Sequence, residues 1–157
     1  MGSKKIVLSQ YQNIVNRAVA QIGKLNLPRE GWLRTVRKAL GMSVSQLAER
    51  LNVTRAQVSK TELVENNGNV TLNTMHKMAE AMGCKFVYAI VPPDKIENLI
   101  LEQAKLKAKY YVSKTNVHMA LEDQLLSGDK IQYEIQRLTD EFYRNISSNL
   151  WKEDKKE

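Results

Sequence analysis

Apolar residues recur every three or four positions along most of the chain, the spacing that places them on one face of an α-helix. Over residues 5–25 this stripe consists of Leu8, Tyr11, Val15, Ala18, Ile22 and Leu25. Asn26-Leu27-Pro28 follows it, and the residue before a proline disfavours helical backbone. We therefore expect an N-terminal helix within residues 1–28.

Four shorter helices are predicted between residues 32 and 83. Two of them start with a capping box, in which a Ser or Thr and a Gln three positions later bond each other's backbone N–H groups; the pairs are Ser43 with Gln46 and Thr54 with Gln57. Thr71 starts the fourth helix, and Gly83 can supply the left-handed backbone that often ends a helix. Residues 29–91 are therefore predicted to form one domain of packed helices with a short strand at its end.

That strand is predicted over residues 85–91, KFVYAIV, where β-branched and aromatic residues replace the helical pattern and Pro92-Pro93 ends the run. A single strand leaves its backbone groups unpaired. We expect it to pair with a strand of another chain or with the N-terminal segment of this one.

Helical spacing returns after the two prolines. Asp94 and Glu97 form a further capping box, another helix covers roughly residues 115–126, and Asp129 is expected to cap the last helix. Residues 92–157 are thus a C-terminal helical region for dimerisation or partner binding, and the predicted fold class is mainly α.

Charge is distributed unevenly along the 157 residues. The net charge is +7, and residues 29–60 alone hold seven basic and two acidic side chains, which is typical of a surface that binds a polyanion. No stretch approaches the roughly 18 apolar residues of a membrane span. Cys84 is the single cysteine, which excludes an intramolecular disulfide and indicates a reducing, cytoplasmic setting.

Residues 45–60, SQLAERLNVTRAQVSK, fit a helix-turn-helix pattern. The small Ala48 allows two short helices to cross closely, and Asn52 stands at the turn, where asparagine tolerates left-handed backbone. Such a unit places its second helix in the major groove of double-stranded DNA. A plain helical hairpin with a polar surface is the alternative, and the two capping boxes and the local positive charge favour DNA binding.

The position of each polar residue predicts its contact. Base edges are expected to meet the early residues of the second helix, Arg55, Ala56, Gln57, Ser59 and Lys60, because Arg and Lys suit guanine, Gln suits adenine and a methyl group suits thymine. Phosphates are expected near the helix starts at Ser43 and Thr54, helped by the free amides there. Ser45 and the phosphate-contacting Arg34 complete the predicted DNA-binding set.

Residues 32–83 resemble the five-helix DNA-binding domain of the lambdoid phage repressors and the wider xenobiotic-response-element-type regulators. The match runs through Leu47-Ala48, Val53-Thr54, Val58-Ser59 and Glu62. This resemblance implies a partly buried ion pair between Arg37 and Glu62 that braces the second helix. Val44 departs from the pattern, since those repressors often carry a phosphate-contacting Gln there, and Asn52 replaces their usual turn glycine.

Three longer blocks resemble the bacterial family called mobile mystery protein A: residues 31–42 (GWLRTVRKALGM), 83–92 (GCKFVYAIVP) and 118–124 (HMALEDQ). The family implies a small regulator found with mobile elements, usually beside a partner with a Fic domain. The resemblance therefore implies an antitoxin-like repressor of its own operon. It leaves open a protein that binds and inhibits the Fic-domain partner, with DNA binding secondary.

Antitoxins of Fic proteins often carry an inhibitory helix of the form Ser/Thr-x-x-x-Glu-Gly/Asn, which Thr61, Glu65 and Asn66 match. The pattern is loose and falls at the end of the predicted recognition helix. Ordinary helix termination explains the same residues, so this motif remains a possible partner-inhibitory site.

No set of residues suggests catalysis, a cofactor or a metal. His76 and His118 are far apart in the sequence, Cys84 has no neighbouring ligand, and glycine-rich phosphate loops are absent. The chain is therefore not expected to be an enzyme. Because one recognition helix contacts few bases, the predicted assembly is a homodimer on paired half-sites.

Overall fold

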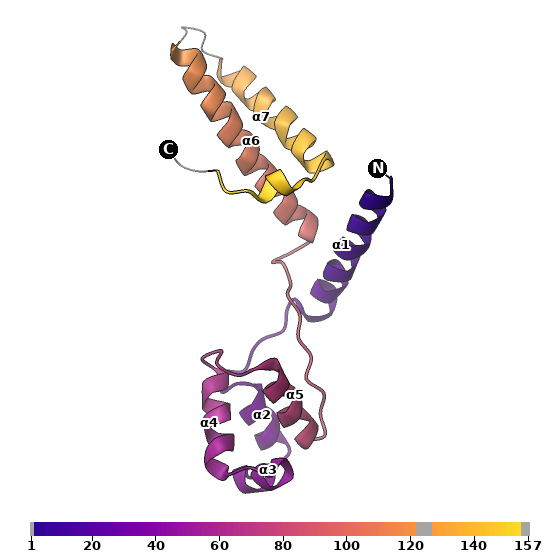
Figure 1. Ribbon diagram of the computed structural model, residues 1–157, viewed down its shortest axis with the longest axis vertical. Coiled ribbons are helices and arrows are strands. Elements are labelled where there is room, and N and C mark those ends of the chain that lie inside the picture. The colour runs from indigo at the N-terminus through magenta and orange to yellow at the C-terminus, as the bar shows by residue number, and fades with distance from the viewer. Residues whose placement is uncertain (1, 122–126, 155–157) are drawn as a thin grey trace. The chain divides into compact units, whose positions relative to one another are not determined.

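The computed structural model describes residues 2–121 and 127–154, and every regular element in these ranges is helical (Figure 1). The chain divides into two compact units. One comprises residues 24–89. The other joins the N-terminal residues up to 23 with the residues from 90 onward.

The unit of residues 24–89 contains four helices, α2 (Trp32–Ala39), α3 (Val44–Leu51), α4 (Arg55–Glu65) and α5 (Leu72–Ala81). Their inward faces form one apolar core of Leu33, Leu47, Ala48, Val58, Met75, Met78 and Met82. The resemblance to phage repressors predicted five helices here, and this unit has four. No fifth helix follows α5, because α5 ends before Gly83 and the β-branched and aromatic residues after it are not helical.

Local signals set the ends of these helices. Both predicted capping boxes are present at the starts of α3 and α4. Asn52 takes the left-handed conformation between them, with φ 55° and ψ 45°. At the end of α5, Gly83 has φ 71°. Its N–H donates to the carbonyl of Glu80, and the N–H of Cys84 donates to the carbonyl of Ala79. This pattern of bonds is a Schellman motif, which satisfies the last carbonyls of the helix.

The strand predicted over Lys85–Val91 is absent from the described residues, where the segment runs without regular secondary structure. A strand exists only through bonds to a neighbour, and the N-terminal segment that could have supplied one is helical, α1 (Gly2–Ile22). Phe86 packs on the apolar core, and the ring of Tyr88 stacks on it. The segment is therefore anchored by side chains alone.

The other unit is built on α6 (Ile96–Leu121) and α7 (Gly128–Arg144), which pack along each other (Figure 1). The sequence predicted two helices where α6 is one, because neither proline nor glycine interrupts residues 96–121. The end of the helix predicted over 115–126 lies outside the described residues, as does the end of the resembling block 118–124.

Two predicted caps in this unit were wrong. Asn16 of α1, rather than a box of Asp94 and Glu97, accepts from the N–H of Ile96 at 3.0 Å, and its amide donates to both carboxylate oxygens of Glu97 at 3.1 and 2.9 Å. α7 begins after Ser127, so Asp129 lies within its first turn, where a negative charge still favours the helix dipole. A side chain from a distant helix thus replaces a local cap.

The C-terminal residues return onto α6 through a short 3-10 helix, η1 (Ser148–Trp151). Leu150 is buried against Ile100 and Ala104, and Gln103 donates to its carbonyl. Lys107 is only 4% exposed, and its ammonium donates to the carbonyl of Lys152 and the carboxylate of Asp154, both at 2.8 Å. This pairing compensates the buried charge and fixes the tail on α6.

Candidate DNA-binding site

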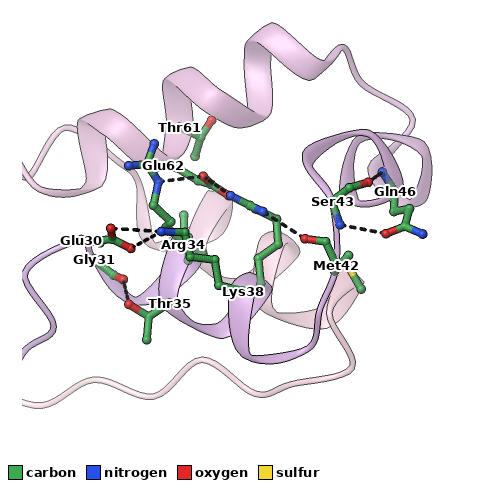
Figure 2. A network of polar contacts seen from close by, with 12 residues as sticks. Glu30, Gly31, Arg34, Thr35, Lys38, Met42, Ser43, Gln46, Thr61 and Glu62 are labelled. Carbon is green, nitrogen blue, oxygen red and sulfur yellow. Dashed lines mark hydrogen bonds and ion pairs between the residues drawn. The ribbon is translucent and has the colours of Figure 1, made fainter.

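Glu62 of α4 stands at the centre of a charged cluster between α2 and α4 (Figure 2). Its side chain is 1% exposed and accepts two hydrogen bonds from the guanidinium of Arg37, one of them at 3.0 Å. The Nε of Arg34 lies 3.3 Å from the same carboxylate. Arg37 also donates to the carbonyl of Met42 at 3.0 Å, beyond the end of α2. The pair implied by the repressor resemblance is thus a buried, two-bond contact.

Burial and charge act in opposite directions on Glu62. Burial alone raises the pKa of its carboxyl, but the hydrogen bonds and charges of Arg37 and Arg34 outweigh it, so the pKa lies below its ordinary value. The hydrogen bond from Arg37 to Glu62 raises the pKa of the guanidinium in turn. Both groups stay charged at neutral pH, and the cluster fixes α4 against α2.

The last turn of α4 makes a second link to α2. The carboxylate of Glu65 accepts from the N–H groups of Trp32 and Leu33 at 2.7 and 3.0 Å, which caps the start of α2. Gly31 precedes that start with φ 80° and ψ 162°. A Cβ at Gly31 would lie 2.7 Å from a carboxylate oxygen of Glu65, so the cap requires glycine.

Sequence reasoning missed this cap. One signal could have suggested it. The N-cap of α2 is Gly31 and not Ser, Thr, Asp or Asn, so no side chain at that position can accept the free N–H groups. A helix start of that kind needs an acceptor from elsewhere in the fold.

The same contacts account for the possible partner-inhibitory motif. Glu65 uses both carboxylate oxygens to cap α2, and the hydroxyl of Thr61 donates to the carbonyl of Gln57 one turn earlier. Asn66 is the residue at which α4 ends. Glu65 and Asn66 thus have roles in starting α2 and ending α4, and Thr61 bonds within α4 itself.

The beginning of α4 is the exposed part of the helix. Val58 is 1% exposed and Glu62 is buried four positions later, which turns the opposite side outward. That outward side carries the six residues predicted in this stretch to contact DNA, all of them exposed: Thr54, Arg55, Ala56, Gln57, Ser59 and Lys60. At the start of α3, Ser43 is exposed and Ser45 is half-buried.

Four of the nine predicted contact residues already have side-chain partners within the domain: Ser43 and Thr54 through their capping boxes, and also Gln57 and Arg34. The Oε1 of Gln57 accepts from the N–H of Thr54 at 2.9 Å, whereas a glutamine that contacts adenine uses both its oxygen and its nitrogen. In this conformation Gln57 offers only its Nε2 to DNA. Arg34 is 39% exposed and tied to Glu62, so it belongs to the charged cluster as well as to the surface.

Positive charge exceeds negative charge in this unit. Residues 24–89 carry ten basic and five acidic side chains, and three of the five acids are engaged: Glu30 with Lys38, Glu62 with arginines and Glu65 with backbone. Arg55 and Lys60 have no ion pair with any residue that the structure describes. A hollow between α4 and α5 adds Lys77, which the sequence did not suggest, beside Lys60.

Residues 33–88 match a family model described as helix-turn-helix. The range covers α2 to α5 and most of the extended segment after them. No curated protein and no solved structure matches the chain. The chain therefore contains a helix-turn-helix domain of the lambda-repressor-like kind, a class of DNA-binding domains that is typically not enzymatic.

None of the helices within 2–121 and 127–154 combines the length and the apolar character needed to cross a membrane. In the same ranges, no three His, Cys, Asp or Glu side chains are grouped as ligands of a metal ion.

Proposed function

We propose that the protein is a sequence-specific DNA-binding regulator that represses its own operon, with α4 as the recognition helix. The observation that carries this proposal is the exposed start of α4. Arg55 and Lys60 extend from it without acidic partners among the described residues, while Val58 and Glu62 hold the helix to the core. A helix presented in this way fits the major groove, where arginine and lysine recognise guanine.

The starts of α3 and α4 are the proposed phosphate contacts. Free N–H groups and the helix dipole make a helix N-terminus attractive to an anion. Ser43 and Thr54 stand at these two starts with exposed side chains, and Ser45 lies in the first turn of α3. Such contacts position the protein on the duplex, and the residues of α4 then select the sequence.

Repression and dimerisation extend this proposal. Two copies on paired half-sites double the number of bases contacted, and a bound dimer blocks the promoter it covers. The resemblance of residues 31–42 and 83–92 to mobile mystery protein A regulators supports an operon that also encodes a partner. In this proposal the protein itself catalyses no reaction.

A footprint on the promoter of its own operon at two salt concentrations tests the proposal. We expect one protected region, because repression requires a specific site. Binding should weaken about a thousandfold or more when salt rises from about 50 to about 200 mM, since Lys and Arg release the counterions of several phosphates. Absence of protection at low salt, or an affinity that salt does not change, would contradict DNA binding at this surface.

Replacing Arg55 by alanine should weaken binding to the operator by about 1–3 kcal/mol and relax the base preference at one position of each half-site. Binding to unrelated DNA should change little, because a base contact adds nothing there. Lys77→Ala is the matched variant. We assign Lys77, which lines the hollow with Lys60, a phosphate contact, so its loss should weaken binding to both DNAs alike. Competition binding with operator and scrambled duplexes separates the two effects, and equal losses for Arg55→Ala would remove it from the base contacts.

A second candidate function is inhibition of a Fic-domain partner, with DNA binding secondary. The observation that favours a protein partner is the apolar surface of α1, where Ile6, Val7, Tyr11 and Ile14 are 62%, 47%, 66% and 62% exposed. A Val7→Glu, Tyr11→Glu variant should then lose the partner and keep the operator. Retention of the partner by this variant would count against α1 as the docking surface.

A further inference from the structure

The extended segment Lys85–Val91 has no part in the site described above. No backbone hydrogen bond joins residues 85–93 to other residues that the structure describes. Three of its apolar side chains are largely exposed, Val87 at 65%, Tyr88 at 64% and Ile90 at 93%. Extended backbone with free N–H and carbonyl groups and this composition is a template for pairing with another chain.

We propose that residues 85–91 pair with the same residues of a second copy, as an antiparallel two-stranded ribbon across a two-fold axis. Within the part of one chain that the structure describes, no residue pairs with the backbone of this segment, and the second copy supplies the missing neighbour. The choice of a second copy rests on the proposed function, since two recognition helices related by a two-fold axis match paired half-sites.

The ends of the segment fix the register of this ribbon. Gly83 ends α5 with a left-handed turn, and Pro92 and Pro93 have no N–H to donate. Two identical antiparallel segments can pair all of residues 85–91 only when Tyr88 lies at the centre. Tyr88 then stands opposite Tyr88 of the second copy, and Phe86 stands opposite Ile90.

Packing supports the same arrangement. Alternation along an extended chain puts Phe86, Tyr88 and Ile90 on one face. On that face the centroid of the Phe86 ring lies 5.1 Å from that of His76 in α5. The ring of Tyr88 stacks on Phe86 with their centroids 5.9 Å apart. A two-stranded ribbon is marginal alone but gains stability when it packs against a helix. Here α5 of each copy provides that support.

The size of the ribbon limits its strength. Seven residues from each copy bury less than the roughly 800 Å² per partner of a standard interface. The dimer is therefore concentration-dependent in solution, and DNA strengthens it by binding both copies at once.

Sedimentation equilibrium without DNA tests the interface. Tyr88→Lys places two like charges directly opposite each other and should raise the dissociation constant of the dimer about tenfold or more. Leu106→Lys is the matched control, because Leu106 is 62% exposed on α6 and lies outside the segment; it should leave the constant unchanged. A wild-type protein that remains monomeric, or a Tyr88→Lys variant that dimerises like wild type, would overturn the proposal.

Single cysteines test the register. Cys84 is free and exposed, so the series starts from Cys84→Ser. Opposite residues have Cβ atoms about 4.5–5.5 Å apart, close enough for a disulfide after a small adjustment, whereas diagonal neighbours lie about 7–8 Å apart. Tyr88→Cys should therefore give a disulfide-linked dimer on oxidation, and Val87→Cys should not; equal linkage of both would overturn the register.

These measurements use no DNA, so their failure leaves the proposed function standing. Conversely, a protein that forms the ribbon but ignores its operator would refute the proposed function and leave the interface intact.

Discussion

Replacing Glu62 by glutamine is expected to lower the free energy of unfolding of the helix-turn-helix unit by about 3–5 kcal/mol. Glutamine keeps the shape of the side chain but removes the charge that compensates Arg37, whose side chain is only 10% exposed. A buried guanidinium without a counter-charge is far more costly than the pair itself is favourable. Urea unfolding followed by circular dichroism measures the loss.

Glu30→Gln is the matched control for this substitution. Glu30 pairs with Lys38 at the surface, where the two side chains are 49% and 55% exposed, so its loss should have little effect. An Arg37→Met, Glu62→Leu variant should recover much of the stability, because it removes both charges and fills the space. If Glu62→Gln unfolds at the same urea concentration as wild type, the cluster does not hold α4 to α2.

The same carboxylate predicts how stability depends on pH. The pKa of Glu62 is lowered in the folded state, so folding favours its charged form. Its contribution is fully present above the ordinary glutamate pKa of about 4.3 and is lost as the pH falls through the lower value of the folded state. The unfolding free energy of wild type should therefore fall in this acidic range, and that of Glu62→Gln should fall less steeply.

Gly31→Ala is expected to cost on the order of 3 kcal/mol of unfolding free energy. Its φ and ψ lie in a region that essentially only glycine adopts, at a cost of about 1–3 kcal/mol for other residues. The added Cβ would also displace Glu65 and remove the cap of α2, which adds about 0.5–2 kcal/mol. Thermal and urea unfolding of the variant measure the sum.

Gly41→Ala separates the two causes of that loss. Gly41 also has a positive φ, 65°, but a Cβ there meets nothing within 4 Å. Only the backbone strain remains, about 1–2 kcal/mol. Equal losses at the two glycines would mean that Glu65 adds nothing to the stability of α2.

The helices of the DNA-binding unit were predictable because their signals are local. Ser43 with Gln46 and Thr54 with Gln57 specify two helix starts within three residues each, and the apolar spacing specifies which side faces the core. The caps from Asn16 and Glu65 were not predictable, because their side chains reach backbone 80 and about 33 residues away. The prediction of a strand was wrong for a related reason: residues 85–91 have the composition of a strand, but no other described residues pair with their backbone.

The candidate site divides in the same way. The apolar Val58 and the buried Glu62 set which side of α4 faces outward, so the exposure of Arg55 and Lys60 followed from the sequence pattern. How Gln57 and Arg34 are used depends on bonds that only the fold supplies. The side-chain oxygen of Gln57 accepts a hydrogen bond at the start of its own helix, and Arg34 donates one to Glu62.

The two links from α4 to α2, at Glu62 and Glu65, have a consequence for how the protein would search DNA. A helix held at both points is preorganised, so little conformational entropy is lost when it binds DNA. Differences between operators should then appear mainly in how long complexes last, with association rates nearly constant. Weakening either link would reduce the difference in lifetime between complexes with different operators before it abolished binding.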